Sequence, residues 1–269
     1  MGTVLAVMTV FWSAAEAAPV VEIIAHRGAS YDAPENTLTA VQLGWKQRAD
    51  VVEFDIWLSK DGQIVLSHDK DTERTAGVKK LIVEQTLEEL RQLDVGRWKD
   101  ERFAGERMPL LSEVLATIPA GKRVFIEIKC GAEIVPELTR VLRTSGQPPE
   151  ALAIICFHDS VITAVKRALP QHKAYWLVSL KRDKQTGEWN HTVERLIARA
   201  KELAADGLDV SACELVDPDF GRRVRAAGLE LYVWTVNDVS VARQMVEAGV
   251  HGITTDRPGW LREHLLPAP

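Results

Sequence analysis

The stretch that decides the fold runs from residue 51 to residue 69 and reads VVEFDIWLSKDGQIVLSHD. It opens with an apolar, β-branched run that is typical of a buried strand. Glu53 and Asp55 are two residues apart in this run, so both carboxylates emerge on one face of the strand. The Asp-Gly pair that follows predicts a hairpin turn, after which the chain returns antiparallel and brings His68 back toward the two carboxylates. The spacing of Glu53, Asp55 and His68 therefore predicts a functional site at this end of the strand.

Outward from this stretch, short apolar runs alternate with helix-period segments from residue 20 to residue 266, as in successive βαβ units with a parallel sheet. We count eight strands, at residues 21–25, 51–56, 124–128, 153–157, 174–178, 208–211, 231–236 and 252–255. We count eight helices, the ranges located being residues 38–48, 87–90, 110–118, 160–169, 191–205, 218–227, 239–248 and 258–265. No change of composition divides the chain, so we predict one α/β domain, a (β/α)₈ TIM barrel.

Residues 69–110 interrupt this pattern after the second strand, because they are polar and only locally periodic. A connection of this length inside a compact domain is usually a lid or a binding loop. We therefore predict an insertion that covers one side of the site.

The N-terminus carries an apolar run at residues 3–12, followed by the small-residue sequence Ala15-Glu16-Ala17. The run is too short to span a bilayer, but it has the length of a signal-peptide core. No positive residue precedes Arg27, which is unusual for a signal peptide. We expect residues 1–17 to be a signal peptide and the protein to be periplasmic or secreted, with a cytoplasmic location as the alternative.

The composition excludes several classes of protein. A net charge of −5 without blocks of basic residues argues against a nucleic-acid binder and against binding to anionic membranes. The three cysteines have no Cys-x-x-Cys spacing, so neither a zinc ribbon nor a disulfide framework is expected. The sequence predicts a small-molecule ligand and no stable insertion into a membrane, and it does not address the oligomeric state.

In a (β/α)₈ barrel, catalytic residues lie at the carboxyl ends of the strands. The predicted strands place His26, Glu53, Asp55, Glu127 and Trp234 at these ends. Three carboxylates from two strands, with no cysteine and no His-x-His pair among the candidate ligands, suit one hard divalent cation, Ca²⁺ or Mg²⁺. Such an ion would balance the carboxylates against a phosphodiester and polarise its phosphoryl oxygens.

The remaining candidates are cations and imidazoles. Arg27 offers a planar fork that matches phosphate oxygens, and Lys129 offers a point charge, although an internal ion pair with Glu127 is an equally ordinary role for this lysine. His26 and His68 are suited to transferring protons near neutral pH, one as base and the other as acid. The sequence does not assign which is which.

The motifs together closely resemble the glycerophosphodiester phosphodiesterase family from about residue 23 to residue 260. The matching pieces are His26-Arg27-Gly28, Pro34-Glu35-Asn36-Thr37, Glu53-Phe54-Asp55, Lys60-Asp61-Gly62, His68-Asp69, Glu127-Ile128-Lys129, Trp234-Thr235-Val236-Asn237 and Gly252-Ile253-Thr254-Thr255-Asp256. The resemblance implies a barrel that hydrolyses glycerophosphodiesters to glycerol 3-phosphate and an alcohol.

The resemblance also implies a role for each candidate residue. It implies acid and base roles for His26 and His68, a metal site at Glu53, Asp55 and Glu127, and substrate contacts from Arg27, Lys129, Trp234 and Phe157. One departure is visible, because Ile155-Cys156-Phe157-His158 stands where the family commonly has a Ser-Phe pair. This departure affects the wall formed by Phe157 and none of the acid, base or metal positions.

Three alternatives stay open at this point. A lysophospholipase D-type phosphodiesterase acting on lysophospholipids would need an apolar entrance, which the charged insertion disfavours. A glycosidase would also use paired carboxylates, but it has no need of the two histidines. A non-catalytic barrel would bind the same ligands without turning them over.

Overall fold

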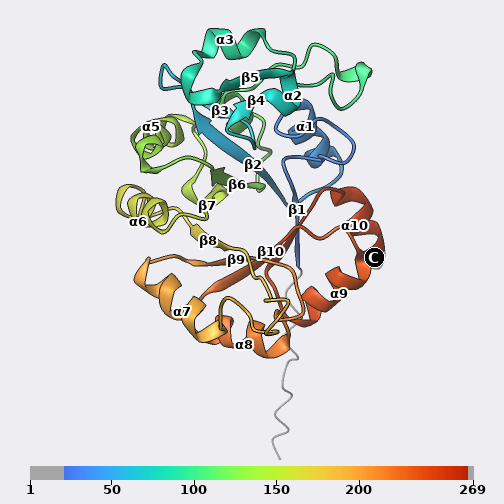
Figure 1. Ribbon diagram of the computed structural model, residues 1–269, viewed down its shortest axis with the longest axis vertical. Helices are drawn as coiled ribbons and strands as arrows, with labels where there is room; N and C mark the ends of the chain where they lie inside the picture. The colour runs from blue at the N-terminus through green and yellow to red at the C-terminus, as the bar shows by residue number, and fades with distance from the viewer. Residues whose placement is uncertain (1–20, 266–269) are drawn as a thin grey trace, which may run out of the picture.

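The computed structural model describes residues 21–265, so the predicted signal peptide at residues 1–17 lies outside the described part of the chain. Eight parallel strands form a closed barrel (Figure 1). They are β1 (Glu22–Ala25), β2 (Val51–Leu58), β6 (Arg123–Ile128), β7 (Leu152–Cys156), β8 (Ala174–Val178), β9 (Gly207–Ser211), β10 (Glu230–Trp234) and β11 (Gly252–Thr255). The barrel closes because β1 pairs with β11 on one side and with β2 on the other.

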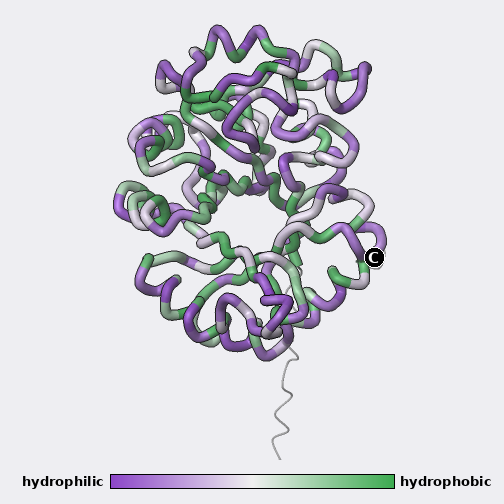
Figure 2. The backbone as a smooth tube through the Cα atoms, in the orientation of Figure 1, coloured by the Kyte–Doolittle hydropathy of each residue, from purple (hydrophilic) through white to green (hydrophobic). Residues whose placement is uncertain are grey.

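A helix follows each barrel strand in residues 21–265 and packs on the outside of the barrel. These helices are α1 (Leu38–Lys46), α4 (Leu111–Leu115), α5 (Val135–Thr144), α6 (Asp159–Ala168), α7 (Val193–Glu202), α8 (Pro218–Ala226), α9 (Val239–Glu247) and α10 (Pro258–Leu265). Figure 2 shows hydrophobic residues along the strands and hydrophilic residues on the outer turns of the helices. The predicted (β/α)₈ TIM barrel is confirmed.

Helix α5 is present in the structure but was not among the helices predicted from the sequence. Its buried residues Val135, Leu138, Val141 and Leu142 follow the helical period, and a proline stands at its start. A 3₁₀ turn precedes the helix, and the site motif at Glu127 ends only a few residues earlier. This pattern was a usable signal that the sequence analysis missed.

The insertion after β2 has its own secondary structure. The strand β3 (Ile64–Leu66) precedes the insertion, and residues 69–110 contain β4 (Asp71–Thr72), α2 (Glu73–Ala76), β5 (Val78–Leu81) and α3 (Leu87–Gln92), at the top of the view in Figure 1. The predicted hairpin is confirmed, because β3 pairs antiparallel with β2. The insertion packs against β3 around a small core of Val65, Ile82, Leu90, Val95 and Met108.

The barrel interior is layered because alternate residues of each strand point inward. The middle layer holds the rings of Phe125, Tyr175 and Tyr232, whose centroids lie 4.8–5.3 Å apart. Below it, both tyrosine hydroxyls donate to Oε2 of Glu230, over 2.7 and 2.9 Å. This aromatic layer forms a floor beneath the carboxyl ends of the strands.

Within residues 21–265, none of the helices combines the length and the apolar character needed to cross a bilayer.

Candidate active site

A cavity of about 160 Å³ opens at the carboxyl ends of the strands. Eight of the nine site residues expected from the sequence line it, namely His26, Arg27, Glu53, His68, Glu127, Lys129, Phe157 and Trp234. The ninth, Asp55, is fully buried and has a carboxylate oxygen within 4.8 Å of those of Glu53 and Glu127. A larger cavity of about 690 Å³ lies at the opposite end of the barrel, but it contains none of these residues.

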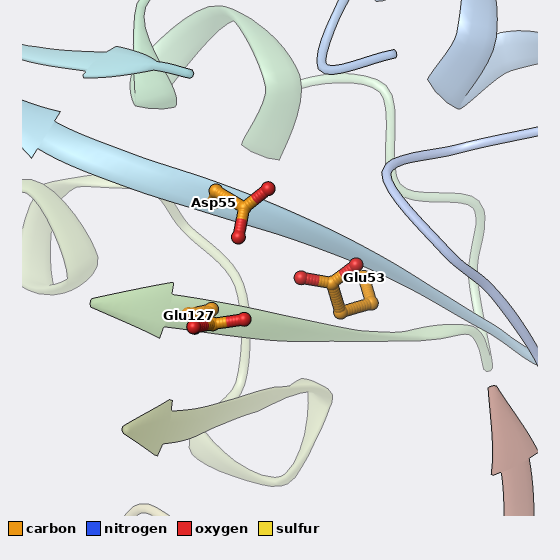
Figure 3. Close-up of side chains that lie close together, drawn as sticks. All are labelled: Glu53, Asp55 and Glu127. Carbon is orange, nitrogen blue, oxygen red and sulfur yellow. The ribbon is translucent and has the colours of Figure 1, made fainter. Parts of the chain in front are cut away.

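Two neighbouring strands hold the three carboxylates. Glu53 and Asp55 lie on β2 and Glu127 lies on β6, where it is in register with Asp55. Figure 3 shows the three side chains converging between the two strands. One oxygen from each carboxylate lies within 4.8 Å of those of the other two. The group predicted from the sequence is therefore close enough to share one cation.

Burial makes this group of carboxylates costly without a cation. Oε1 of Glu53 and Oδ1 of Asp55 are buried and have no hydrogen-bond partner among the described residues. Burial, together with the charges of the other two carboxylates, raises the pKa of Glu53 well above its usual value. Burial and the charge of Asp55 raise the pKa of Glu127 to about 8. Three converging buried carboxylates, two of which have an oxygen without a hydrogen-bond partner, fit a hard divalent cation.

Asp55 differs from the other two carboxylates because two cations lie against it. Nε of Arg27 is 3.3 Å from Oδ2 of Asp55, and Nζ of Lys129 is 3.4 Å from Oδ1. Asn36 adds a hydrogen bond from Nδ2 to Oδ2, over 2.8 Å. Burial alone would raise the pKa of Asp55, but these charges and this hydrogen bond hold it below its usual value. Asp55 is therefore ionised even without a metal.

The two cations also contact other carboxylates while lining the cavity. Nη1 of Arg27 donates to Glu35 over 2.9 Å, and Nζ of Lys129 donates to Glu127 over 2.7 Å. The internal ion pair considered for Lys129 is thus present at the site itself. Their carboxylate partners hold the side chains of Arg27 and Lys129 in position, so both face the cavity and are oriented toward an anion bound there.

The turn after β1 requires an unusual backbone. Arg27 has φ of +53° and Gly28 has φ of +80°. A Cβ on Gly28 would lie 2.4 Å from the carbonyl carbon of Ala40, so only glycine fits at this position. The turn directs the amide of Arg27 to Oε2 of Glu53, over 2.8 Å. Left-handed backbone at a non-glycine residue is costly and is concentrated at functional sites.

Each of the two histidines is oriented by an aspartate. Nδ1 of His26 contacts Oδ1 of Asp256 at 2.6 Å, and Nδ1 of His68 contacts Oδ1 of Asp69 at 2.9 Å. A carboxylate can only accept, so Nδ1 carries the proton in both rings and Nε2 is left for the ligand. Hydrogen bonds, chiefly from His26, lower the pKa of Asp256 to about 2 although burial opposes this.

The role of Asp256 was missed by the sequence analysis, although the residue belongs to a motif that was noted. The pair forms because β1 and β11 are neighbours, and the amide of His26 donates to the carbonyl of Thr255 over 2.9 Å. Closure of a barrel always places the last strand beside the first, and this was the available signal.

Two aromatic rings form one wall of the cavity. Phe157 follows β7, and Trp234 ends β10. Their rings meet edge to face with centroids 5.6 Å apart. Nε1 of Trp234 donates to the backbone carbonyl of Asp209 over 3.2 Å, so the indole is fixed from below. An apolar wall opposite the charged wall suits a ligand with both phosphate and carbon parts.

The insertion contacts the site through Arg74 of α2. Its guanidinium donates from Nε to Asp69 over 2.6 Å, and from Nη2 to Glu35 over 2.7 Å. These carboxylates in turn contact His68 and Arg27, so one arginine of the insertion lies behind two residues of the cavity.

Comparison with known proteins agrees with this geometry. A family model described as "Glycerophosphoryl diester phosphodiesterase family" matches residues 26–260. A glycerophosphodiester phosphodiesterase of Caldanaerobacter subterraneus subsp. tengcongensis is 33% identical, with 88% of this chain and 94% of that protein covered. Glycerophosphodiester phosphodiesterase 1 of Mus musculus is 28% identical, with 81% and 72% covered.

A solved structure shows the same fold. It is an Oleispira antarctica phosphodiesterase in complex with the product sn-glycerol-3-phosphate, with a TM-score of 0.80 and 28% identity. The match covers 91% of this chain and 96% of that one. With the family model matching nearly the whole barrel, the chain belongs to the glycerophosphoryl diester phosphodiesterase family, a family of hydrolases.

Proposed function

We propose that the protein hydrolyses glycerophosphodiesters to glycerol 3-phosphate and an alcohol. The observation that carries this proposal is the cavity in which two aspartate-oriented imidazoles, Arg27 and Lys129 surround one space beside three carboxylates. The Oleispira phosphodiesterase of the same fold, in complex with sn-glycerol-3-phosphate, supports the choice of product.

The two histidines would carry out the two proton transfers of the reaction. One imidazole takes the proton from the attacking oxygen as that oxygen forms its bond to phosphorus. The other gives a proton to the alkoxide as the phosphorus–oxygen bond to the alcohol breaks. Burial lowers the pKa of His68, so this ring is neutral near pH 7 and suited to accept a proton. Arg27 and Lys129 hold the phosphate oxygens during both steps.

We propose one divalent cation, Ca²⁺ or Mg²⁺, as the cofactor, held by Glu53, Asp55 and Glu127. The buried oxygens of Glu53 and Asp55 that lack a hydrogen-bond partner among the described residues support this choice. When bound, the ion would polarise the phosphoryl oxygens and offset the negative charge that develops in the transition state. The protein holds the ligands in place through the Arg27 amide on Glu53 and the Asn36 side chain on Asp55.

The proposal is tested by assaying the purified protein on glycerophosphocholine, with lysophosphatidylcholine as the lipid comparison. We expect turnover of glycerophosphocholine, its loss on exhaustive chelation, and its recovery with Ca²⁺ or Mg²⁺. His26→Ala should abolish turnover without unfolding the barrel. Faster turnover of the lysophospholipid would favour the lysophospholipase D-type alternative, and activity that survives chelation would contradict the metal proposal.

We also propose that residues 1–17 direct export to the periplasm or the medium. The apolar run at residues 3–12 and the small residues after it support this. Expression of the full chain followed by mass spectrometry of the fractionated protein tests the proposal. A mature N-terminus near residue 18 in the exported fraction is expected, whereas an intact chain retained in the cytoplasm would contradict it.

We further propose that residues 69–110 act as a lid over one side of the cavity. Its contacts with the β1–α1 loop support this, because Nζ of Lys99 donates to the carbonyl of Ser30 over 2.8 Å and Arg74 reaches Glu35. Cross-linking this contact should slow substrate entry if the segment moves, and unchanged kinetics would contradict a moving lid.

A further inference from the structure

Asp209 is a carboxyl group inside the barrel that the reaction described above does not use. It lies at the centre of β9, where its neighbours Leu208 and Val210 point outward into the main core. Its side chain therefore points inward, in register with Leu177 of β8 and Tyr232 of β10. It is 1% exposed and forms part of the lining of the catalytic cavity.

This carboxyl group lacks the partners that a buried acid normally has. Its Oδ1 is buried without a hydrogen-bond partner among the described residues. The two cations that line the cavity, Arg27 and Lys129, are paired with other carboxylates. Asp209 is also outside the group of three carboxylates that could share a cation. An unpaired polar group in this position destabilises the fold, so it calls for a functional explanation.

The surroundings of Asp209 define the kind of ligand that it could contact. The nearby cavity wall is apolar and includes Ile155, Leu177 and Trp234, while the aromatic layer closes the floor. Burial, and after it the charge of Glu127, raises the pKa of Asp209 well above its usual value. This shift favours the protonated form, and a protonated carboxyl group can donate a hydrogen bond as well as accept one. A short carbon chain with hydroxyl groups satisfies both the apolar wall and the acid.

We propose that Asp209 hydrogen-bonds a hydroxyl group of the substrate's glycerol moiety and thereby selects glycerol-bearing phosphodiesters. This inference rests on the proposed function. The cations Arg27 and Lys129 stand at the charged side of the cavity and would take the phosphate, so the glycerol carbons would extend along the apolar wall toward Asp209. A site built to hydrogen-bond a hydroxyl discriminates strongly against ligands that lack it, because its polar group is then left unpaired.

The test compares two variants on two substrates. Asp209→Leu removes the hydrogen bond but keeps the same branched side-chain shape, and Asp209→Asn retains a donor and an acceptor at nearly the same volume. Glycerophosphocholine carries the glycerol hydroxyls, whereas bis(p-nitrophenyl) phosphate lacks them. We expect Asp209→Leu to lower kcat/KM for glycerophosphocholine by about ten- to a hundredfold. Its kcat/KM for bis(p-nitrophenyl) phosphate should change less than about twofold, and Asp209→Asn should recover part of the loss.

A stability measurement separates binding from a structural role. Removing an unpaired buried acid should leave the Tm of Asp209→Leu equal to that of the wild type or higher. Asp206, just before β9, is the matched control, because its carboxylate is paired with Lys166 at 2.8 Å and accepts from the amide of Ala174. Asp206→Leu should lower the Tm and leave the ratio of the two kcat/KM values unchanged.

The outcomes are distinguishable. If the wild-type protein turns over neither substrate, the proposed function fails and this inference fails with it. If the wild type turns over both and Asp209→Leu leaves their ratio unchanged, only the role of Asp209 is refuted. A loss that is present with glycerophosphocholine but absent with glycerophosphoglycerol would also refute it, because the group recognised would then be the ammonium of the head group.

Discussion

Replacing Glu127 by glutamine should remove a pH dependence from the stability of the metal-free protein. The ordinary pKa of a glutamate side chain is 4.5. In the folded protein the pKa of Glu127 rises to about 8, because the carboxyl group is buried beside Asp55. Between these two values the folded state holds a proton that the unfolded state has released. The stabilisation of the folded state by this proton is therefore complete below about pH 4.5 and is lost as the pH rises to about 8.

The size of the effect follows from that interval. The free energy of unfolding falls steadily as the pH rises from 4.5 to about 8, by roughly 5 kcal/mol in all for one such group. Histidines with lowered pKa values, such as His68, act in the opposite direction below about pH 6.5. The quantity to compare is therefore the difference between wild type and Glu127→Gln, from which these contributions cancel.

The assay is chemical unfolding in the presence of chelator at about pH 5, 6.5 and 8. The stability of Glu127→Gln relative to wild type should rise steadily over this range. Added Ca²⁺ or Mg²⁺ should stabilise the wild type more at pH 8 than at pH 5, because the ion competes with the protons on the carboxylates. Parallel pH profiles for the two proteins would refute the raised pKa, and equal stabilisation by the cation at both pH values would refute a site at these carboxylates.

Three further substitutions test other parts of the site. Asp256→Asn should lower kcat by about a hundredfold or more with little change in Tm, because the amide no longer fixes the ring and proton position of His26; normal steady-state kinetics would refute that role. Arg74→Ala should lower kcat about tenfold, since Asp69 and Glu35 both lose their shared cation; Arg74→Lys should recover only part of the loss, and full activity in Arg74→Ala would contradict the coupling. Glu53→Gln should remain folded by circular dichroism but need a higher cation concentration for half-maximal activity, and an unchanged cation requirement would show that Glu53 is not a ligand.

The strand ends and their residues were predictable because the strongest patterns in this sequence are local. Strand alternation at Glu53 and Asp55, and the hairpin that returns to His68, depend only on neighbouring residues. In a parallel barrel, every strand ends at the same rim, so local patterns were enough to bring the residues together.

Other parts of the site depend on contacts between distant positions, which local patterns do not contain. Asp256 is 230 residues from His26 along the chain, and Arg74 reaches Glu35 across 39 residues. In the sequence, Asp209 is a single acid between apolar neighbours. Whether its side chain lines the cavity depends on which face of β9 points inward. The small core between the insertion and β3 was not predicted either, because its apolar residues are dispersed among charged ones in the sequence.

The period of two along each strand connects the fold to the chemistry. On β6 the inward positions are Phe125 and then Glu127, so an aromatic floor residue is followed directly by a carboxylate. On β10 the same spacing places Tyr232 in the floor and Trp234 in the wall. A shift of one residue in the register of either strand would exchange these side chains with residues of the outer core. The tight packing of the three floor rings resists such a shift, because their close contacts hold the strands in one register. The same floor separates the cavity from the opposite end of the barrel, so the carboxylates above it stay in the low-dielectric surroundings that raise the pKa values of Glu53 and Glu127 and favour a bound cation.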